Sequence, residues 1–356
     1  MPNCLKCGAE LAVNEEGVAP VLCDRCAGRA TSRARRGMST GTFRDSPATS
    51  ALVAINLAVL LGMFVTGGAA TFGPENLLRW GANYGPLTLG GEYWRLVTAG
   101  FVHGGIYHIA FNMWALWSLG RLSEKLFGSW VTFAVYLLTG VGGAMLTLAW
   151  NPHQFEVGAS GAVFGIAGAI LSGIKFGHVA VSSFERRSIF SSLTFFVVFN
   201  LAIGFGLVSV GVGIDNMCHL GGLLTGLIFG APLATASASG KKSFEWITIV
   251  LVALIMTVLG SRLVQVKGQA NPEAAIRRAL QSQDYPQAIQ ILEKLTSEQP
   301  TNDRVWLVLG YAYEKNEQKD RAIAAYEQAL KLNPNSSDAK EALAELRGNA
   351  PQEKQH

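Results

Sequence analysis

The stretch EVGASGAVFGIAG, residues 156–168, places Ser160 among small residues at the start of a long apolar run. Two interpretations fit this pattern. Small residues let helices in a membrane approach closely, so Ser160 is explained as a packing residue. Its hydroxyl is instead a nucleophile if a neighbouring base activates it. The motif alone favours packing, and the surrounding sequence has to decide between the two.

The composition favours an integral membrane protein. Hydrophobic residues make up 49% of the 356-residue chain, charged residues make up 15%, and 40 residues are glycine. An average soluble protein has about 25% charged residues. The net charge is only +4, and the basic residues form no stripe, so we expect no nucleic-acid partner.

Seven apolar windows are long enough to cross a bilayer, which requires about 20 residues. The sequence therefore predicts an all-α polytopic membrane protein, with six helices in a core and a seventh after it. The predicted spans are residues 51–68, 103–120, 130–150, 158–177, 191–210, 215–236 and 244–264.

Basic residues predict how these spans are oriented. Lys and Arg are concentrated before span one and after spans two, four and six, whereas the opposite loops contain Arg79 and Arg95. Loops rich in Lys and Arg remain cytoplasmic. We therefore expect a cytoplasmic N-terminus and an external C-terminal tail, in a bacterial inner or plasma membrane. The aromatic-rich segment 69–102 is expected to lie at the external interface with the membrane lipid.

Polar residues within the spans gather at one depth. Spans two, four and six all start near the external face. Their first turns contain His103, His108 and Asn112 in span two, Ser160 in span four, and Asp215 and His219 in span six. A polar side chain in hydrocarbon is costly unless it is paired or functional, so each is a candidate site residue. Because His108 and Asn112 are four residues apart, they share one face of a helix.

Two glycine-lined helix faces are expected to pack against each other. One follows Ser160 and the other follows His219, and each has glycine at four-residue spacing: Gly161 and Gly165, and Gly222 and Gly226. Alone, His219 is also explained as an interhelical hydrogen-bonding residue. Together, the two faces predict that Ser160 and His219 come within hydrogen-bond reach as nucleophile and base. N–H groups of the first helical turn, with His108 and Asn112, would then stabilise an oxyanion.

These residues resemble those of rhomboid intramembrane serine proteases, over about residues 51–236. The resemblance rests on four motifs: Trp94-Arg95, FVHGGIYHIAFN at 101–112, GASG at 158–161 and HLGGLLTG at 219–226.

The resemblance implies a rhomboid-like six-helix core and a catalytic dyad of Ser160 and His219. It implies oxyanion contacts from His108, Asn112 and the Ser160 backbone, and cleavage of transmembrane segments of substrate proteins without a catalytic cofactor. Phe164 stands where many members of the family have tyrosine.

Three further interpretations have to be weighed. Asp215 lies one turn before His219 and suggests a catalytic triad, but its position favours a cap for the following helix. The alternative function is a catalytically silent rhomboid-like chaperone or adaptor that binds transmembrane helices, which the presence of both Ser160 and His219 disfavours. A transporter is disfavoured because the sequence shows no inverted repeat.

Four cysteines near the N-terminus predict a structural zinc site. Cys4, Cys7, Cys23 and Cys26 form two C-x2-C pairs with the spacing of a zinc ribbon. Two disulfides are the competing interpretation, which a reducing cytoplasmic location disfavours. Four thiolates leave no open coordination position, so this zinc would not be catalytic.

The C-terminal region repeats with a period of 34 residues. Ala288 and Ala322 are one such pair, and Pro300 and Pro334 are another. Trp306-x2-Leu309-Gly310-x2-Tyr313 matches the tetratricopeptide signature. The sequence predicts a short α-solenoid that binds a protein partner, or alternatively a stabilising cap on span seven. If it is a tether, its deletion should leave cleavage of a generic substrate unchanged.

These observations divide the chain into five parts: a cytoplasmic zinc-ribbon-like domain and basic linker at 1–46, a rhomboid protease core at 47–240, a seventh transmembrane helix at 241–268, a tetratricopeptide domain at 269–347 and a disordered tail at 348–356.

Overall fold

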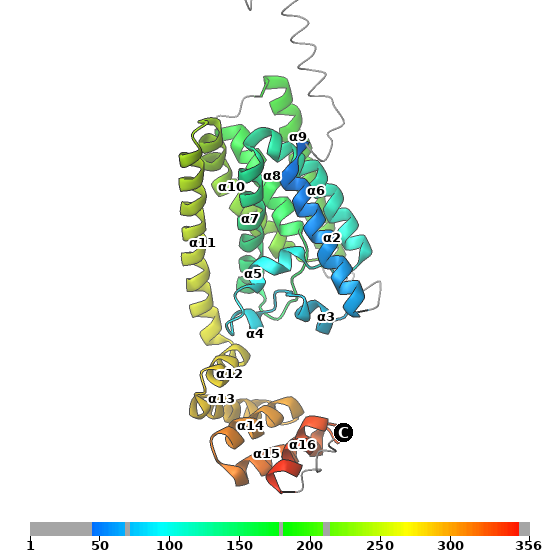
Figure 1. Cartoon of the computed structure of the whole chain (residues 1–356), viewed down its shortest axis with the longest axis vertical. Helices are drawn as coiled ribbons and strands as arrows, with labels where there is room; N and C mark the ends of the chain where they lie inside the picture. Colours follow the sequence, from blue (N-terminus) through cyan, green and yellow to red (C-terminus); the bar gives the residue numbers. More distant parts are fainter. Residues whose placement is uncertain (1–44, 68–71, 178–180, 209–213, 349–356) are drawn as a thin grey trace, which may run out of the picture.

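The computed structural model describes residues 45–67, 72–177, 181–208 and 214–348, and this part of the chain is mostly helical. A helical bundle is joined by one long helix to a smaller helical module (Figure 1). The four N-terminal cysteines, and with them the predicted zinc ribbon, lie outside the described residues.

Long helices coincide with all seven predicted spans. Five are long and apolar enough to cross a membrane: α2 (Pro47–Gly67), α7 (Ser129–Trp150), α9 (Ser183–Val208), α10 (Asn216–Ala238) and α11 (Lys242–Ala270). The other two are α6 (Ile106–Phe127), which contains three charged residues near its end, and α8 (Ser160–Phe176), which has only 17 residues. The helical membrane protein is thus confirmed, and the count of seven spans stays a prediction.

The second predicted span differs from the helix that forms there. The apolar window covers 103–120, but α6 starts at Ile106, after Gly104-Gly105, and continues to Phe127. Gly128 then has a φ of 86°, a left-handed conformation that ends the helix. The additional turns include Arg121 and Lys125, which the charge pattern assigns to the following loop.

Glu124 in these additional turns connects α6 to the start of α2. Its side-chain oxygens accept hydrogen bonds from the backbone N–H of Ala48 at 3.1 Å and of Thr49 at 2.7 Å. The first N–H groups of a helix have no partner within it and carry partial positive charge. The carboxylate therefore caps α2, which explains how an acidic residue is accommodated at a buried helix contact.

The central helix of the bundle is α8, and α10 packs directly against it (Figure 1). A Cβ added to Gly222 would lie 1.9 Å from the carbonyl oxygen of Gly161, and one added to Gly226 would lie 2.0 Å from that of Gly165. No side chain fits at these distances. The α8 and α10 backbones are in contact because these positions are glycine.

The chain between α2 and α6 forms short helices, which lie at one end of the bundle (Figure 1). They are α3 (Pro74–Arg79), α4 (Gly85–Thr88), α5 (Arg95–Thr98) and the 3-10 helix η2 (Ala99–Phe101). We call residues 74–101 the end loop.

The end loop is paired with the segment that leads into α8. Asn83 and Glu156 form an isolated antiparallel bridge with two backbone hydrogen bonds of 3.0 Å. The Asn83 amide also donates to the Glu156 carboxyl at 2.8 Å. Burial raises the pKa of Glu156 to about 8, because a low-dielectric environment disfavours the charged carboxylate, and the Asn83 hydrogen bond opposes this effect only in part.

Five helices form the C-terminal module: α12 (Pro272–Gln281), α13 (Tyr285–Glu298), α14 (Asp303–Lys315), α15 (Lys319–Leu332) and α16 (Ser337–Leu346). The turns within the two helix pairs are equivalent, since Gln283 and Glu317 both have a φ of 59° and are 34 residues apart. The module lies at the end of the bundle where the end loop lies, and α12 contacts α4 (Figure 1).

We predict that ionisation of Glu156 destabilises the fold as the pH rises. Its pKa is higher in the folded chain than the ordinary Glu value of 4.5, so the folded state binds the proton more tightly and loses stability between that pH and about 8. In detergent, the melting temperature of Glu156→Gln should therefore rise relative to wild type across this interval and level off above it. The exposed Glu75→Gln should follow wild type. Parallel curves for Glu156→Gln would contradict the prediction.

Candidate active site

Ser160 and His219 meet at the end of the bundle covered by the end loop. Ser160 is the first residue of α8, and His219 lies in the first turn of α10. The Ser160 Oγ is 2.8 Å from Nε2 of His219, within hydrogen-bond distance. The residues are 59 positions apart in sequence, and the glycine contact between α8 and α10 brings them together. A nucleophile and its base require such an arrangement.

Phe164 fixes the orientation of the imidazole. It lies one turn after Ser160, and its ring stacks on that of His219 with centroids 4.4 Å apart and planes 4° apart. The phenyl ring is only 3% exposed. A phenyl ring does this by packing alone, so the missing tyrosine hydroxyl does not remove the contact.

Asp215 is a helix cap, as its position predicted. Its carboxylate accepts from the Cys218 backbone N–H at 2.9 Å and from the Thr147 hydroxyl at 2.7 Å. Among the described residues, Nδ1 of His219 has no hydrogen-bond partner. In this part of the chain, therefore, no carboxylate orients the imidazole from behind.

His108 and Asn112 lie beside the turn that precedes Ser160. A Cβ on Gly158 would lie 2.7 Å from the His108 ring and 3.7 Å from the Asn112 amide nitrogen. Gly158 also has a φ of 111°, where a side chain would be strained. The Asn112 amide donates to the His108 carbonyl at 2.9 Å, which leaves its second N–H for another acceptor. We call residues 156–160 the serine turn. Both side chains thus border the space next to it.

His103, a candidate from its place in the second predicted span, holds this turn together with residues outside the proposed dyad and oxyanion set. His103 is fully buried, and its Nε2 lies 3.4 Å from the Ala159 backbone N–H. The Gly158 N–H donates to the Ala99 carbonyl at 2.9 Å. Cys218, next to His219, lies 3.4 Å from the Glu156 carboxyl. These contacts join segments that are far apart in the chain, so no local sequence pattern indicates them.

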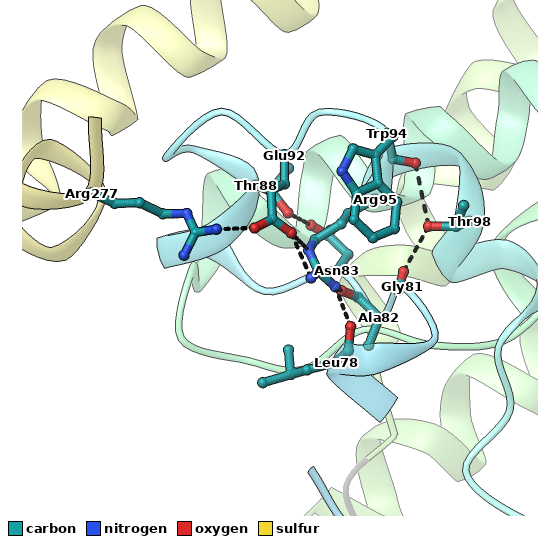
Figure 2. A network of polar contacts seen from close by, with 10 residues as sticks. All are labelled: Leu78, Gly81, Ala82, Asn83, Thr88, Glu92, Trp94, Arg95, Thr98 and Arg277. Atoms are coloured by element: carbon teal, nitrogen blue, oxygen red, sulfur yellow. Dashed lines mark hydrogen bonds and ion pairs between the residues drawn. The ribbon is translucent and has the colours of Figure 1, made fainter. Parts of the chain in front are cut away.

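Arg95 connects several parts of the end loop (Figure 2). Its guanidinium donates to the carbonyls of Leu78 at 2.7 Å and Ala82 at 3.0 Å, and it pairs with Glu92 at 2.6 Å. The Arg95 side chain is only 7% exposed. Its buried positive charge is balanced by the Glu92 carboxylate, and the two carbonyl oxygens accept its hydrogen bonds. Trp94 lies over the same guanidinium, at 4.5 Å. The Trp94-Arg95 motif therefore has a structural role in shaping the loop.

The described residues contain no cluster of three or more His, Cys, Asp or Glu that could hold a metal ion. The chemistry that this arrangement can support is nucleophilic attack by a serine hydroxyl, assisted by histidine and by hydrogen-bond donors at the start of a helix.

Comparisons with known proteins identify two regions. Residues 90–236 match the sequence profile of the Rhomboid domain, and residues 279–346 match that of the Tetratricopeptide repeat. The first match includes Ser160 and His219, and the second begins within α12.

Similar proteins include two that are named as rhomboid proteases and one that is named RHOMBOID-like. Rhomboid protease GluP of Bacillus subtilis (strain 168) is 29% identical over 84% of this chain and 58% of its own length. Rhomboid protease AarA of Providencia stuartii is 27% identical over 59% of this chain and 81% of its own. RHOMBOID-like protein 6, mitochondrial, of Arabidopsis thaliana is 36% identical over 44% of this chain and 48% of its own. This chain thus covers about half the length of two of these relatives. Its similarity to the Rhomboid domain is confined to residues 90–236 and is followed by similarity to tetratricopeptide repeats at 279–346.

Proposed function

We propose that this protein is an intramembrane serine endopeptidase that cleaves transmembrane segments of other membrane proteins. The observation that carries the proposal is the 2.8 Å contact between the Ser160 Oγ and Nε2 of His219 at the starts of two helices in an apolar bundle. The names of two relatives, GluP and AarA, support the same activity. A silent chaperone would require neither this contact nor the ring of Phe164 stacked on His219.

The proposed reaction uses each group in turn. The Ser160 Oγ attacks the carbonyl carbon of the scissile peptide while Nε2 of His219 takes the hydroxyl proton. The oxyanion that forms is stabilised by the Ser160 N–H and by the side chains of His108 and Asn112, since each well-placed donor lowers the barrier by about 3 kcal/mol. His219 then gives its proton to the leaving amine, and water hydrolyses the acyl-enzyme in the same way.

The surface of α6 supports a substrate that arrives from the membrane. Around His108, its outward side chains are large and apolar: Tyr107, Phe111 and Trp114 are 84%, 71% and 69% exposed. Such a surface suits lipid and an apolar substrate helix, and the polar groups for cleavage lie just inside it.

We further propose an orientation and a role for the ends of the chain. The basic loops support a cytoplasmic N-terminus, and the module of α12–α16 then lies on the external side together with Ser160. Tetratricopeptide repeats support recognition of a protein partner there. The C-x2-C pairs support a structural zinc site formed by Cys4, Cys7, Cys23 and Cys26.

The dyad is tested by substitution. Ser160→Ala and His219→Ala should each lower cleavage of a model transmembrane substrate about a thousandfold or more, and the double variant should be no worse, because nucleophile and base act as a unit. Ser172→Ala, which removes another buried hydroxyl from α8, should remain active. Turnover by purified Ser160→Ala close to that of wild type would exclude the mechanism.

The orientation is tested by labelling. A cysteine replacing Ser337, at the start of α16, should react with a membrane-impermeant maleimide on intact cells. A cysteine replacing Ser183, at the start of α9, should react only after lysis. The reverse pattern would show that the proposed orientation is wrong.

The zinc site is tested by metal analysis. Purified protein should contain about one zinc ion per chain. Replacing Cys4 and Cys23 with serine should remove the metal, whereas Cys218→Ser should retain it. Metal-free protein whose four N-terminal thiols are all freely alkylated would refute the site.

A further inference from the structure

The first helix of the C-terminal module is bound to the end loop by two arginines. Arg277 of α12 pairs with the Glu92 carboxylate (Figure 2). Arg278 donates to the Leu89 carbonyl at 2.6 Å and to the Gly268 carbonyl at 2.7 Å. Ala274 of the same helix is fully buried in an apolar cluster with Leu89. The module is therefore docked on the bundle as well as linked to it.

Glu92 passes this contact to the centre of the end loop. One carboxylate oxygen binds Arg277 and the other binds Arg95. The Glu92 side chain is 19% exposed and the Arg95 side chain is 7% exposed, so water screens these charges only weakly. Arg95 in turn holds the carbonyl of Ala82, the residue before Asn83.

Asn83 passes the contact on to the serine turn. Its backbone is paired with Glu156, four residues before Ser160. Its side chain accepts from Thr88 at 2.7 Å and donates to Glu156 at 2.8 Å. In addition, the Ala99 carbonyl of the end loop accepts a hydrogen bond from the Gly158 N–H. Apart from the chain links from Ala82 to Asn83 and from Glu156 to Ser160, each step of this path is a hydrogen bond or ion pair between buried or half-buried groups.

We propose that Arg277 is a positioning residue for Ser160, because its contact with Glu92 holds Arg95 and thereby the end loop that is paired with the serine turn. The proposal rests on the proposed function. It gives the C-terminal module a role in the active site of its own chain, in addition to any partner that it binds. The tether that the sequence alone suggests would leave cleavage of a generic substrate unchanged when the module is altered, whereas the docked module would not.

The experiment is a double-mutant cycle in the full-length protein with a model transmembrane substrate that lacks an external domain. Arg277→Gln should lower kcat by about fivefold or more with little change in KM, since the serine turn is affected and the substrate-binding surface is not. Arg277→Lys should recover part of the rate. In a Glu92→Gln background the additional effect of Arg277→Gln should disappear, because the two residues act through one contact. Arg304→Gln, an exposed arginine on α14, is the matched control.

A second measurement does not depend on activity. Amide hydrogen exchange over residues 156–160 should become faster in Arg277→Gln and remain unchanged in Arg304→Gln, at equal melting temperatures. Unchanged exchange and kcat in Arg277→Gln, or an equal loss of rate in the Glu92→Gln background, would overturn the proposal. If wild-type protein shows no Ser160-dependent cleavage, the proposed function fails, and the exchange measurement still decides the positioning role.

Discussion

The backbone contact between α8 and α10 is the constraint on which the rest of the structure depends. Gly222 and Gly226 lie against the carbonyls of Gly161 and Gly165, where even a methyl group would collide. The contact sets the distance between the two helix starts, and with it the distance between a hydroxyl on one and an imidazole on the other. Because α8 is buried on nearly all sides, the surrounding helices cannot move to accommodate a larger residue.

Polar groups at the end of the bundle find their hydrogen-bond partners in other segments of the chain. Arg95 is the clearest case, since a buried guanidinium is tolerated only when its donors meet acceptors. It has Glu92 and two loop carbonyls. The end loop is therefore held by these hydrogen bonds in addition to its apolar contacts, such as those of Leu89. The shape of the end loop therefore depends on the residues that contact Arg95. It also depends on Arg277 of the C-terminal module, which contacts Arg95's partner Glu92.

Much of this arrangement could be predicted from the sequence, because the underlying signals are periodic and local. Apolar windows indicated the long helices, four-residue glycine spacing indicated the close helix pair, and a 34-residue period indicated the module. The boundary of α6 could not be predicted, because Glu124 is retained in a helix by a cap that it gives to α2, 75 residues away. Likewise, nothing near Arg277 in the sequence indicates Glu92, 185 residues earlier. Such pairs depend on topology, which a single sequence does not reveal.

The continuity of α11 has a consequence for how this chain tolerates insertions. The helix runs unbroken from Lys242 to Ala270, and α12 begins at Pro272 after a single intervening residue. Each residue added to an α-helix rotates the downstream chain by about 100° and advances it by about 1.5 Å. One residue added within α11 would therefore turn α12 away from α4, whereas seven would return it close to its original direction about 10 Å further out. The number of residues in α11 thus sets the direction in which α12 points as well as the distance that α11 spans. The largely apolar composition of α11 gives no sign of this constraint.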